Sequence, residues 1–298
     1  MKASSLIALG GLVAASGGAA QAQTVNLYEM TDAGLENVSN VAAAAAGGSL
    51  VRVPTNTGML PSRLGMRGRE DLGAGLSAPY TMEMGLGADT GASGQGGRLF
   101  GRRSFVGLSG DRGAVTAGRQ WTMLFWTVID SDIVGPSVYG LGSLDSYIPN
   151  SRIDNSIAYK GKFSDVTLSA TYSLDRDTVN AGPSPAGTNC AGENGADSKA
   201  CREYPVMAKY DPKGWGAALG YDRINGGIAT TFGGLTSSAR SDSRLLVNGY
   251  ANIGTVKLAG GVIRRNNEGL PTSPKSNLWY VGAAFPATPA LTIDGTLT

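Results

Sequence analysis

The sequence predicts an all-β fold, and the alternation of side chains along the chain is the first observation that supports it. From Val166 to Asp175, every even position is apolar and every odd position is polar. Because successive side chains of a β-strand point to opposite faces of the sheet, this segment has one apolar and one polar face. The same alternation recurs along the chain, at 62–70, 76–84, 151–160, 204–210, 215–222 and again from residue 244 onward.

The composition is the second observation. Gly accounts for 45 of the 298 residues, roughly twice its average usage, and Phe for only 6. The core of a soluble sandwich of this size needs more bulky apolar side chains. A barrel with a water-filled lumen needs none there, because its apolar face points outward to lipid. The sequence therefore predicts a transmembrane antiparallel β-barrel.

The N-terminal residues have the features of an export signal. Lys2 precedes an apolar run from Leu6 to Ala15, and Ala20-Gln21-Ala22 is a small-x-small cleavage site. We expect residues 1–22 to be a signal peptide. No later segment reaches the roughly 18 consecutive apolar residues of a transmembrane helix. The chain is therefore predicted to be exported without a helical anchor.

Charge and residue types argue against nucleic-acid binding and catalysis. The formal net charge of +2 is no nucleic-acid signature. The chain contains no His, which excludes Ser-His-Asp and Cys-His arrangements. We predict a protein that is not an enzyme and that uses no metal and no cofactor.

The two cysteines, Cys190 and Cys201, lie in a segment rich in Gly, Asn, Asp and Ser. In an exported protein, an even pair this close in sequence predicts a disulfide across a loop. A metal site is not expected from them, because no His and no further Cys is present to complete it.

The connections between candidate strands alternate in length. Residues 211–214 form a tight turn, whereas 176–203 and 224–243 are long and polar, as is typical of outer-membrane barrels. The connection at 121–150 differs, because it is apolar and has no basic residue. A loop of this length and apolarity is out of place at a solvated surface, so we expect it to fold inward and pack against the lumen wall.

Taken together, the residues resemble the Gram-negative general diffusion porins, in particular the trimeric type of β-proteobacteria. No single motif decides the resemblance, which rests on the order and spacing of several. These are Thr24-Val25-Asn26-Leu27-Tyr28, Asp32-Ala33-Gly34, Ser62-Arg63-Leu64-Gly65-Met66-Arg67-Gly68, Glu70-Asp71-Leu72-Gly73, Gly96-Gly97-Arg98-Leu99-Phe100-Gly101-Arg102, Phe105-Val106-Gly107-Leu108-Ser109-Gly110, Gly118-Arg119-Gln120, Arg152-Ile153-Asp154-Asn155-Ser156, Cys190 to Arg202, and Lys209-Tyr210-Asp211.

The resemblance implies a 16-stranded barrel in the bacterial outer membrane, of which this chain covers about 13 strands. Residues 23–298 are then expected to be a porin barrel that lacks its C-terminal strands. The resemblance also implies a homotrimer in contact with outer-membrane lipids. A long third loop narrows each lumen, and ions and small hydrophilic solutes pass by diffusion.

Carried over by residue, the resemblance assigns Arg63, Arg102 and Arg152 to the basic wall of the constriction and adds Arg67 as a further wall position. It puts Asp132 near the acidic tip of the inward loop, with Asp130 beside it. Because the family's acidic tip motif is not intact here, we expect a mild anion preference.

Alternation supports a lumen position for Arg63, Arg67 and Arg102, because each lies on the polar face of its strand. Arginine facing lipid near the midplane costs roughly 2–4 kcal/mol. Arg103 lies on the parity opposite Arg102 and is expected to point away. The alternative is that all of these arginines are ordinary wall charges without a role in selectivity.

A second functional hypothesis is an exported surface β-protein that acts as an adhesin or recognition module through its long loops. The loops at 176–203 and 224–243 motivate it. The sequence leaves open which solute is preferred, whether divalent ions bind, and the oligomeric state.

Overall fold

The computed structural model describes residues 24–41, 47–55, 61–135, 140–145, 152–174, 195–227, 235–269 and 274–298. The expected signal peptide, residues 1–22, lies outside them. In the described part, one sheet of 13 strands follows the order of the chain. Its strands are β1 (Thr24–Met30), β4 (Arg63–Gly73), β5 (Leu76–Gly85), β6 (Arg103–Gly110), β7 (Gly113–Trp121), β8 (Arg152–Phe163), β9 (Val166–Ser173), β10 (Val206–Tyr210), β11 (Trp215–Asn225), β12 (Ser241–Ile253), β13 (Val256–Asn267), β14 (Lys275–Thr288) and β15 (Leu291–Leu297).

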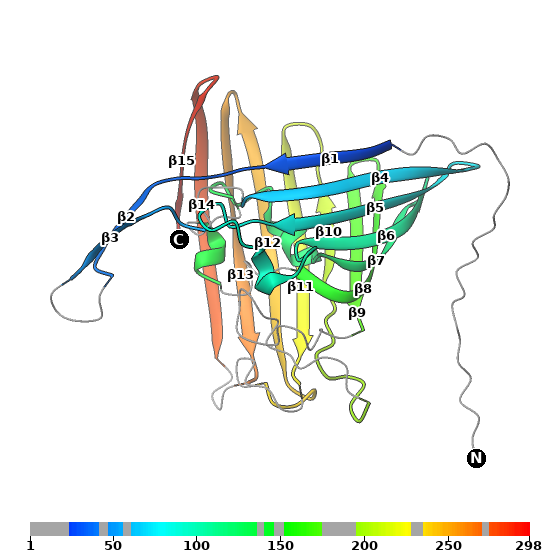
Figure 1. Ribbon diagram of the computed structural model, residues 1–298. Helices are drawn as coiled ribbons and strands as arrows, with labels where there is room; N and C mark the ends of the chain where they lie inside the picture. The colour runs from blue at the N-terminus through cyan, green and yellow to red at the C-terminus, as the bar shows by residue number, and fades with distance from the viewer. Residues whose placement is uncertain are drawn as a thin grey trace, which may run out of the picture.

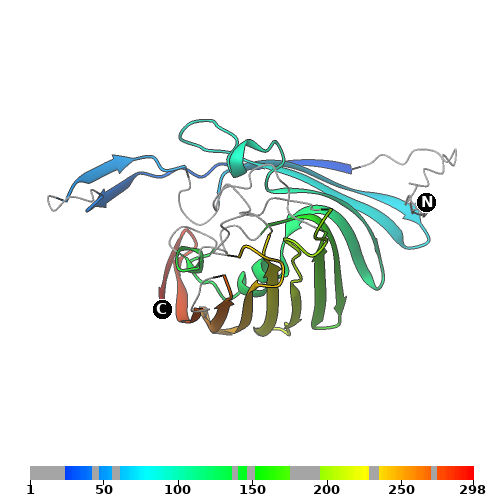
Figure 2. The same ribbon diagram turned by 90° about the horizontal axis from the view of Figure 1, so that it is seen from below.

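Neighbouring strands of this sheet pair antiparallel, and the sheet curves around a central space (Figures 1 and 2). Strands β1 and β15 are the two edge strands of this sheet. A separate hairpin of β2 (Glu36–Ser39) and β3 (Ser49–Arg52) extends beyond the sheet from the connection between β1 and β4. The all-β class and the strand number expected for this chain are confirmed.

Short turns and long connections alternate along the sheet, as the sequence predicted. Turns are short after β4, β6, β8, β10, β12 and β14, and connections are longer after β5, β7, β9, β11 and β13. The connection after β5 includes one helical turn, α1 (Gly94–Gly97). In outer-membrane barrels the short turns lie on the periplasmic side. This assigns the short-turn end of the present sheet to that side.

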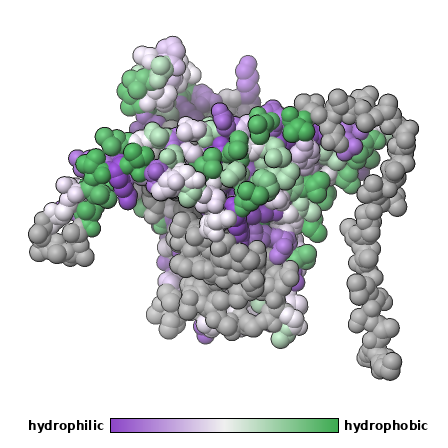
Figure 3. All heavy atoms as spheres, viewed as in Figure 1, coloured by the Kyte–Doolittle hydropathy of each residue, from purple (hydrophilic) through white to green (hydrophobic). Residues whose placement is uncertain are grey.

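Strand β9 is inside out relative to a soluble protein. Its apolar positions are exposed, with Leu168 at 45%, whereas its polar positions are buried, with Thr167 at 7%. Strand β11 repeats this pattern over most of its length. Large apolar side chains are exposed on most strands, and apolar residues appear at the surface in Figure 3. The alternation therefore gives the sheet an outer face that is compatible with lipid. The last residue of the predicted alternating segment, Asp175, lies outside the described residues.

The connection between β7 and β8 lies inside the curve, as its apolar composition predicted. It contains α2 (Met123–Val128), which packs on β9 to β12, and the 3-10 helix η1 (Leu141–Ser143). Thr122 caps α2, because its hydroxyl accepts a hydrogen bond from the backbone N–H of Phe125. We call residues 122–145 the inward loop. None of the helices in the described ranges is long and apolar enough to cross a membrane.

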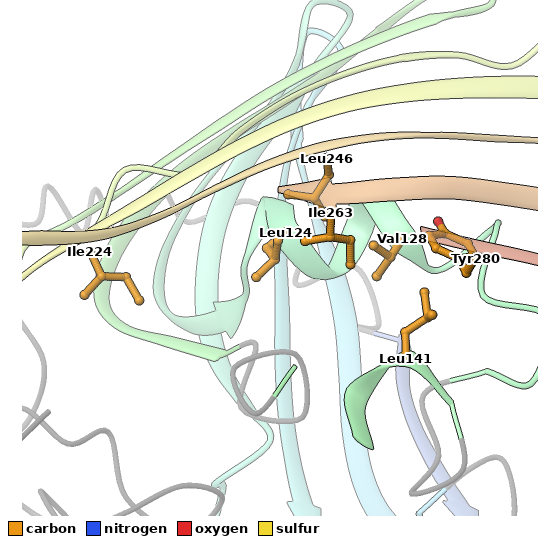
Figure 4. Packing of buried hydrophobic residues seen from close by; sticks show 7 residues of the cluster. All are labelled: Leu124, Val128, Leu141, Ile224, Leu246, Ile263 and Tyr280. Atoms are coloured by element: carbon orange, nitrogen blue, oxygen red, sulfur yellow. The ribbon is translucent and has the colours of Figure 1, made fainter. Parts of the chain in front are cut away.

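The inward loop rests on an apolar patch of the sheet (Figure 4). Leu124, Val128 and Leu141 of the loop form one buried cluster with side chains from four strands: Ile224, Leu246, Ile263 and Tyr280. This patch replaces polar wall residues in the part of the lumen that the loop covers. Burial of these side chains fixes the loop against one half of the sheet, β9 to β14.

Candidate functional site

Arginines gather on the other half of the sheet, at the long-loop ends of its strands. Arg63, Arg103 and Arg152 are the first residues of β4, β6 and β8, and Arg119 stands near the end of β7. Alternate strands begin at the same end of an antiparallel sheet, so the ladder brings these side chains together. We call the following residues the arginine group: Arg63, Arg98, Arg102, Arg103, Arg119 and Arg152.

Glu83 of β5 is the first carboxylate in this group. Its Oε1 accepts a hydrogen bond from Nε of Arg102 at 2.7 Å, and its Oε2 accepts one from Nη2 of Arg103 at 2.9 Å. The hydroxyl of Tyr28 donates to the same Oε2 at 2.7 Å. Glu83 and Arg102 are almost fully buried, with side-chain exposures of 2% and 4%. Two guanidiniums thus share one buried carboxylate.

The prediction that Arg103 points away from Arg102 is wrong. Arg103 is the cross-strand partner of Glu83 in the β5–β6 ladder, so both side chains lie on the lumen face. Arg102 precedes the strand, and its backbone N–H donates to the carbonyl of Glu83 at 3.0 Å. The alternation of a strand does not apply to a residue outside it, which is why both neighbours reach the same carboxylate.

Asp154 of β8 is the second carboxylate in the group. Nη1 of Arg119 donates to its Oδ1, and Nη1 of Arg98 lies 3.2 Å from its Oδ2. Nε of Arg119 donates to the carbonyl of Gly101 at 2.7 Å. Asp154 therefore holds two further guanidiniums at the lumen wall.

Trp121, the last residue of β7, contacts Arg152 and also Arg102. The guanidinium carbon of Arg152 lies 4.0 Å from the centroid of its ring, and that of Arg102 lies 5.4 Å away. The ring of Phe125 stacks on Trp121 at 4.0 Å. Within the described residues, Nε of Arg152 and Nη1 of Arg102 are buried and have no hydrogen-bond partner.

Within the described residues, the site holds more guanidiniums than carboxylates. Ion pairs join the arginine group to the carboxylates of Glu83 and Asp154. Arginine does not readily lose its proton, so the excess of guanidiniums over carboxylates remains as positive charge. Such a group attracts anions and repels cations that pass near it.

The other two predicted wall arginines lie at the edge of this group. Arg63 is half-buried and close enough to Arg102 for their charges to repel each other. Arg67 is exposed, lies over the ring of Tyr28 at 5.1 Å and lines a cavity of about 730 Å³ on the lumen side of β4 and β5.

The predicted acidic residues of the inward loop lie elsewhere. Oδ2 of Asp130 accepts a hydrogen bond from Nζ of Lys209 on β10 at 2.6 Å. Asp132 is buried in the loop, where its carboxylate accepts backbone hydrogen bonds from Leu141 and Gly135, and burial raises its pKa to about 6. The structure thus brings Arg63, Arg102 and Arg152 together but does not bring Asp130 or Asp132 to them.

The inward loop has a buried ionic anchor that sequence reasoning missed. Nε and Nη2 of Arg244 donate to the two carboxylate oxygens of Asp145 at 2.8 and 3.0 Å. The hydroxyls of Ser131 and Tyr280 lie 2.6 Å apart. Nothing in the local sequence links Arg244 to Asp145, which lies 99 positions away in the chain.

Cys201 is buried and takes part in a disulfide. Cys190 lies outside the described residues, so the pairing of the two cysteines stays a prediction.

Fold and site together define a membrane-spanning β-barrel channel whose lumen carries fixed charges. Residues 6–298 match the Gram-negative porin family. The chain is 30% identical over 289 residues to an outer membrane porin protein of Bordetella pertussis, covering 92% of this chain and 70% of that protein. It is 31% identical over 287 residues to outer membrane porin protein 32 of Delftia acidovorans, covering 95% and 75%.

The chain belongs to the Gram-negative porin family, and it is a passive channel of the outer membrane. Its fold is similar to that of the anion-selective porin from Comamonas acidovorans, with a TM-score of 0.67 and 24% identity over 92% of this chain and 77% of that one. A loop-deletion mutant of OmpT, an outer membrane protein of Vibrio cholerae, gives a TM-score of 0.63 at 15% identity.

Proposed function

We propose that this porin conducts anions in preference to cations and that the arginine group sets this preference. The observation that carries the proposal is the shortage of carboxylates beside the arginines. Glu83 and Asp154 are bonded to the group, and the guanidinium of Arg152 lies over the ring of Trp121. A permeating anion can offset that charge, whereas a cation is repelled.

The geometry of the group suits conduction better than tight binding. Conduction requires sites that ions enter readily and also leave. Arg102 and Arg103 already donate to Glu83, and Arg119 donates to Asp154. These bonds lower the affinity of the three guanidiniums for a passing anion. We therefore propose that Arg63, Arg67, Arg102 and Arg152 are selectivity residues and that ions and small hydrophilic solutes pass by diffusion.

We further propose that the protein works as a homotrimer and has no catalytic activity. The trimer rests on the resemblance to trimeric porins, and it predicts conductance steps in groups of three. The porin function of the family and relatives supports a channel, rather than an adhesin or an enzyme, as the role of this chain.

Single-channel recording in two salts tests the proposed selectivity. Replacement of potassium by a bulky organic cation should leave most of the chloride conductance intact. Replacement of chloride by a bulky organic anion should remove most of the conductance. The opposite pattern would contradict the proposal.

A further inference from the structure

A second set of basic residues lies on the short-turn side of the inward loop. Its members are Lys160 and Lys162 of β8, Lys209 of β10 and Lys257 of β13, and we call them the lysine group. Lys160 shares the lumen face of β8 with the buried residues Asp154, Ser156 and Ala158. Unlike them, Lys160 is exposed, so its charge is accessible from the lumen.

Part of the lysine group is neutralised by carboxylates. Nζ of Lys209 lies 2.6 Å from Oδ2 of Asp130 and 3.0 Å from Oδ2 of Asp211. The hydroxyl of Tyr250 also donates to Asp211. Asp165 of the β8–β9 turn lies beside them, because its carbonyl accepts a hydrogen bond from the backbone N–H of Asp211 at 2.9 Å. Four lysines and these three aspartates leave the described part of the region with a positive excess.

Aromatic rings hold two of the other lysines in the group, Lys160 and Lys257. Nζ of Lys160 lies 4.2 Å from the ring centroid of Trp126 in α2, and Nζ of Lys257 lies 4.9 Å from that of Tyr250. A ring attracts an ammonium through its quadrupole and carries no net charge. A carboxylate in the same place would cancel the charge of the lysine, so a ring fixes the position of the ammonium and leaves its charge available.

Trp126 is itself held firmly. It packs against the buried cluster of Met123, Ala158 and Met207, and its ring meets that of Phe125 edge-on at 5.4 Å. Phe125 in turn stacks on Trp121, which supports Arg152. One aromatic row, made of Trp121 at the end of β7 and Phe125 and Trp126 of the inward loop, thus contacts the arginine group at one end and Lys160 at the other.

The two basic groups act at different depths. Lys160 lies eight residues after Arg152 in the same strand. At about 3.3 Å per residue and a strand tilt near 40°, they are separated by roughly 20 Å along the pore axis. The Debye length is about 10 Å in 0.1 M salt, so the two groups attract ions independently.

We propose that the lysine group is a second anion-attracting station in series with the arginine group. Lys160 is its pore-facing member, and Trp126 is the positioning residue that keeps Lys160 in place at full charge. This inference rests on the proposed anion preference. It adds that the preference is built at two depths, with Trp121 at the end of β7 beside the arginine group and Trp126 of the inward loop beside Lys160.

The test is the anion-to-cation permeability ratio of the purified full chain, measured from zero-current potentials in a KCl gradient. Lys160→Gln should lower the ratio about twofold, because one partly screened charge is removed. Trp126→Leu should lower it similarly although no charge changes, and Trp126→Phe should restore it. Lys213→Gln, in the exposed turn after β10, removes the same charge away from any such ring and should have a smaller effect.

Chemical modification in the folded channel avoids the risk that a variant misfolds. A Lys160→Cys variant should regain the lost selectivity when a cationic thiol reagent is added, and lose more of it with an anionic one. An anion-selective parent whose Lys160→Gln ratio is unchanged overturns this inference but leaves the proposed function intact. A Trp126→Leu ratio equal to that of the parent overturns the positioning role. A parent without anion selectivity overturns the proposed function itself.

Discussion

Arg152 and Trp121 are cross-strand partners in the β7–β8 ladder, and the guanidinium carbon of Arg152 lies 4.0 Å from the centroid of the indole ring. The ladder register alone brings the two side chains together. At this point of the lumen, the partner of a basic wall residue is a ring instead of the carboxylate that a constriction loop was expected to supply. Arg152 is buried, at 6% exposure, so its charge acts on ions in the lumen through its field rather than by contact.

Replacement of Arg152 by Gln should lower the preference for chloride over potassium several-fold, because one pore charge is lost beside buried neighbours that screen it poorly. Stability should change little, since Nε of Arg152 has no hydrogen-bond partner in the described residues. The measurement is the zero-current potential in a KCl gradient. Arg112→Gln, in the exposed turn between β6 and β7, is the control with the same loss of charge.

Glu83→Gln should have opposite effects on selectivity and stability. Anion preference should rise, because a carboxylate of the arginine group becomes neutral. Breaking a buried ion pair by removing one partner costs about 3–5 kcal/mol. The Gln side chain keeps one acceptor oxygen, so the donors on the other side would face an NH2 group instead of an oxygen. Denaturant unfolding in detergent, followed by tryptophan fluorescence, should show the loss of stability. A stable variant with reduced anion preference would contradict this account of Glu83.

The buried pair of Asp145 and Arg244 should anchor the inward loop. Asp145→Asn and Arg244→Met should each destabilise the protein by about 3 kcal/mol, and the double variant by clearly less than their sum. The check is a double-mutant cycle of unfolding free energies. Additive effects would mean that the pair contributes no coupling energy.

Asp132 should make the stability of the inward loop depend on pH. Burial raises its pKa to about 6 from 3.8, so between these values the folded protein binds more protons than the unfolded chain. This contribution to stability therefore falls as pH rises from 4 to 6. Asp132→Asn should raise stability at pH 8 by roughly 1–3 kcal/mol and change little at pH 4. Thermal unfolding at the two pH values is the measurement, and a variant destabilised equally at both would contradict it.

Charge on the outer face should be costly in a depth-dependent way. Val247 lies in the middle of β12 and is 48% exposed, whereas Ile253 ends the strand. Val247→Arg should cost about 2–4 kcal/mol of folding free energy, and Ile253→Arg at most about 1. Folding titrations into lipid vesicles distinguish the two, and equal costs would argue against a lipid-facing β12.

The fold was predictable because its main signal is local. The alternation in Val166–Ser173 assigns each face without knowledge of the neighbouring strands, and the apolarity of residues 121–150 indicates an inward position. The apolar patch under the loop was not predictable. By alternation with Arg244 and Asn248, Leu246 faces the lumen, but the local sequence does not show that the inward loop covers it there.

The site was predictable only in part. Alternation and the family resemblance identified Arg63, Arg102 and Arg152, but their partners depend on ladder register, which no single segment contains. Glu83 meets Arg103 because β5 and β6 pair in one register. Asp130 is bonded to Lys209 because α2 packs on β10 and carries the residues after it to that wall. Sequence spacing gave no indication of either contact.

The zero-current potential of the unmodified protein in a tenfold KCl gradient tests the central claim most directly. If the excess of guanidiniums over carboxylates governs permeation, this potential takes the sign of the chloride equilibrium potential. Addition of salt should reduce its magnitude, because ions screen the fixed charges. A potential with the sign of the potassium equilibrium potential would contradict the account.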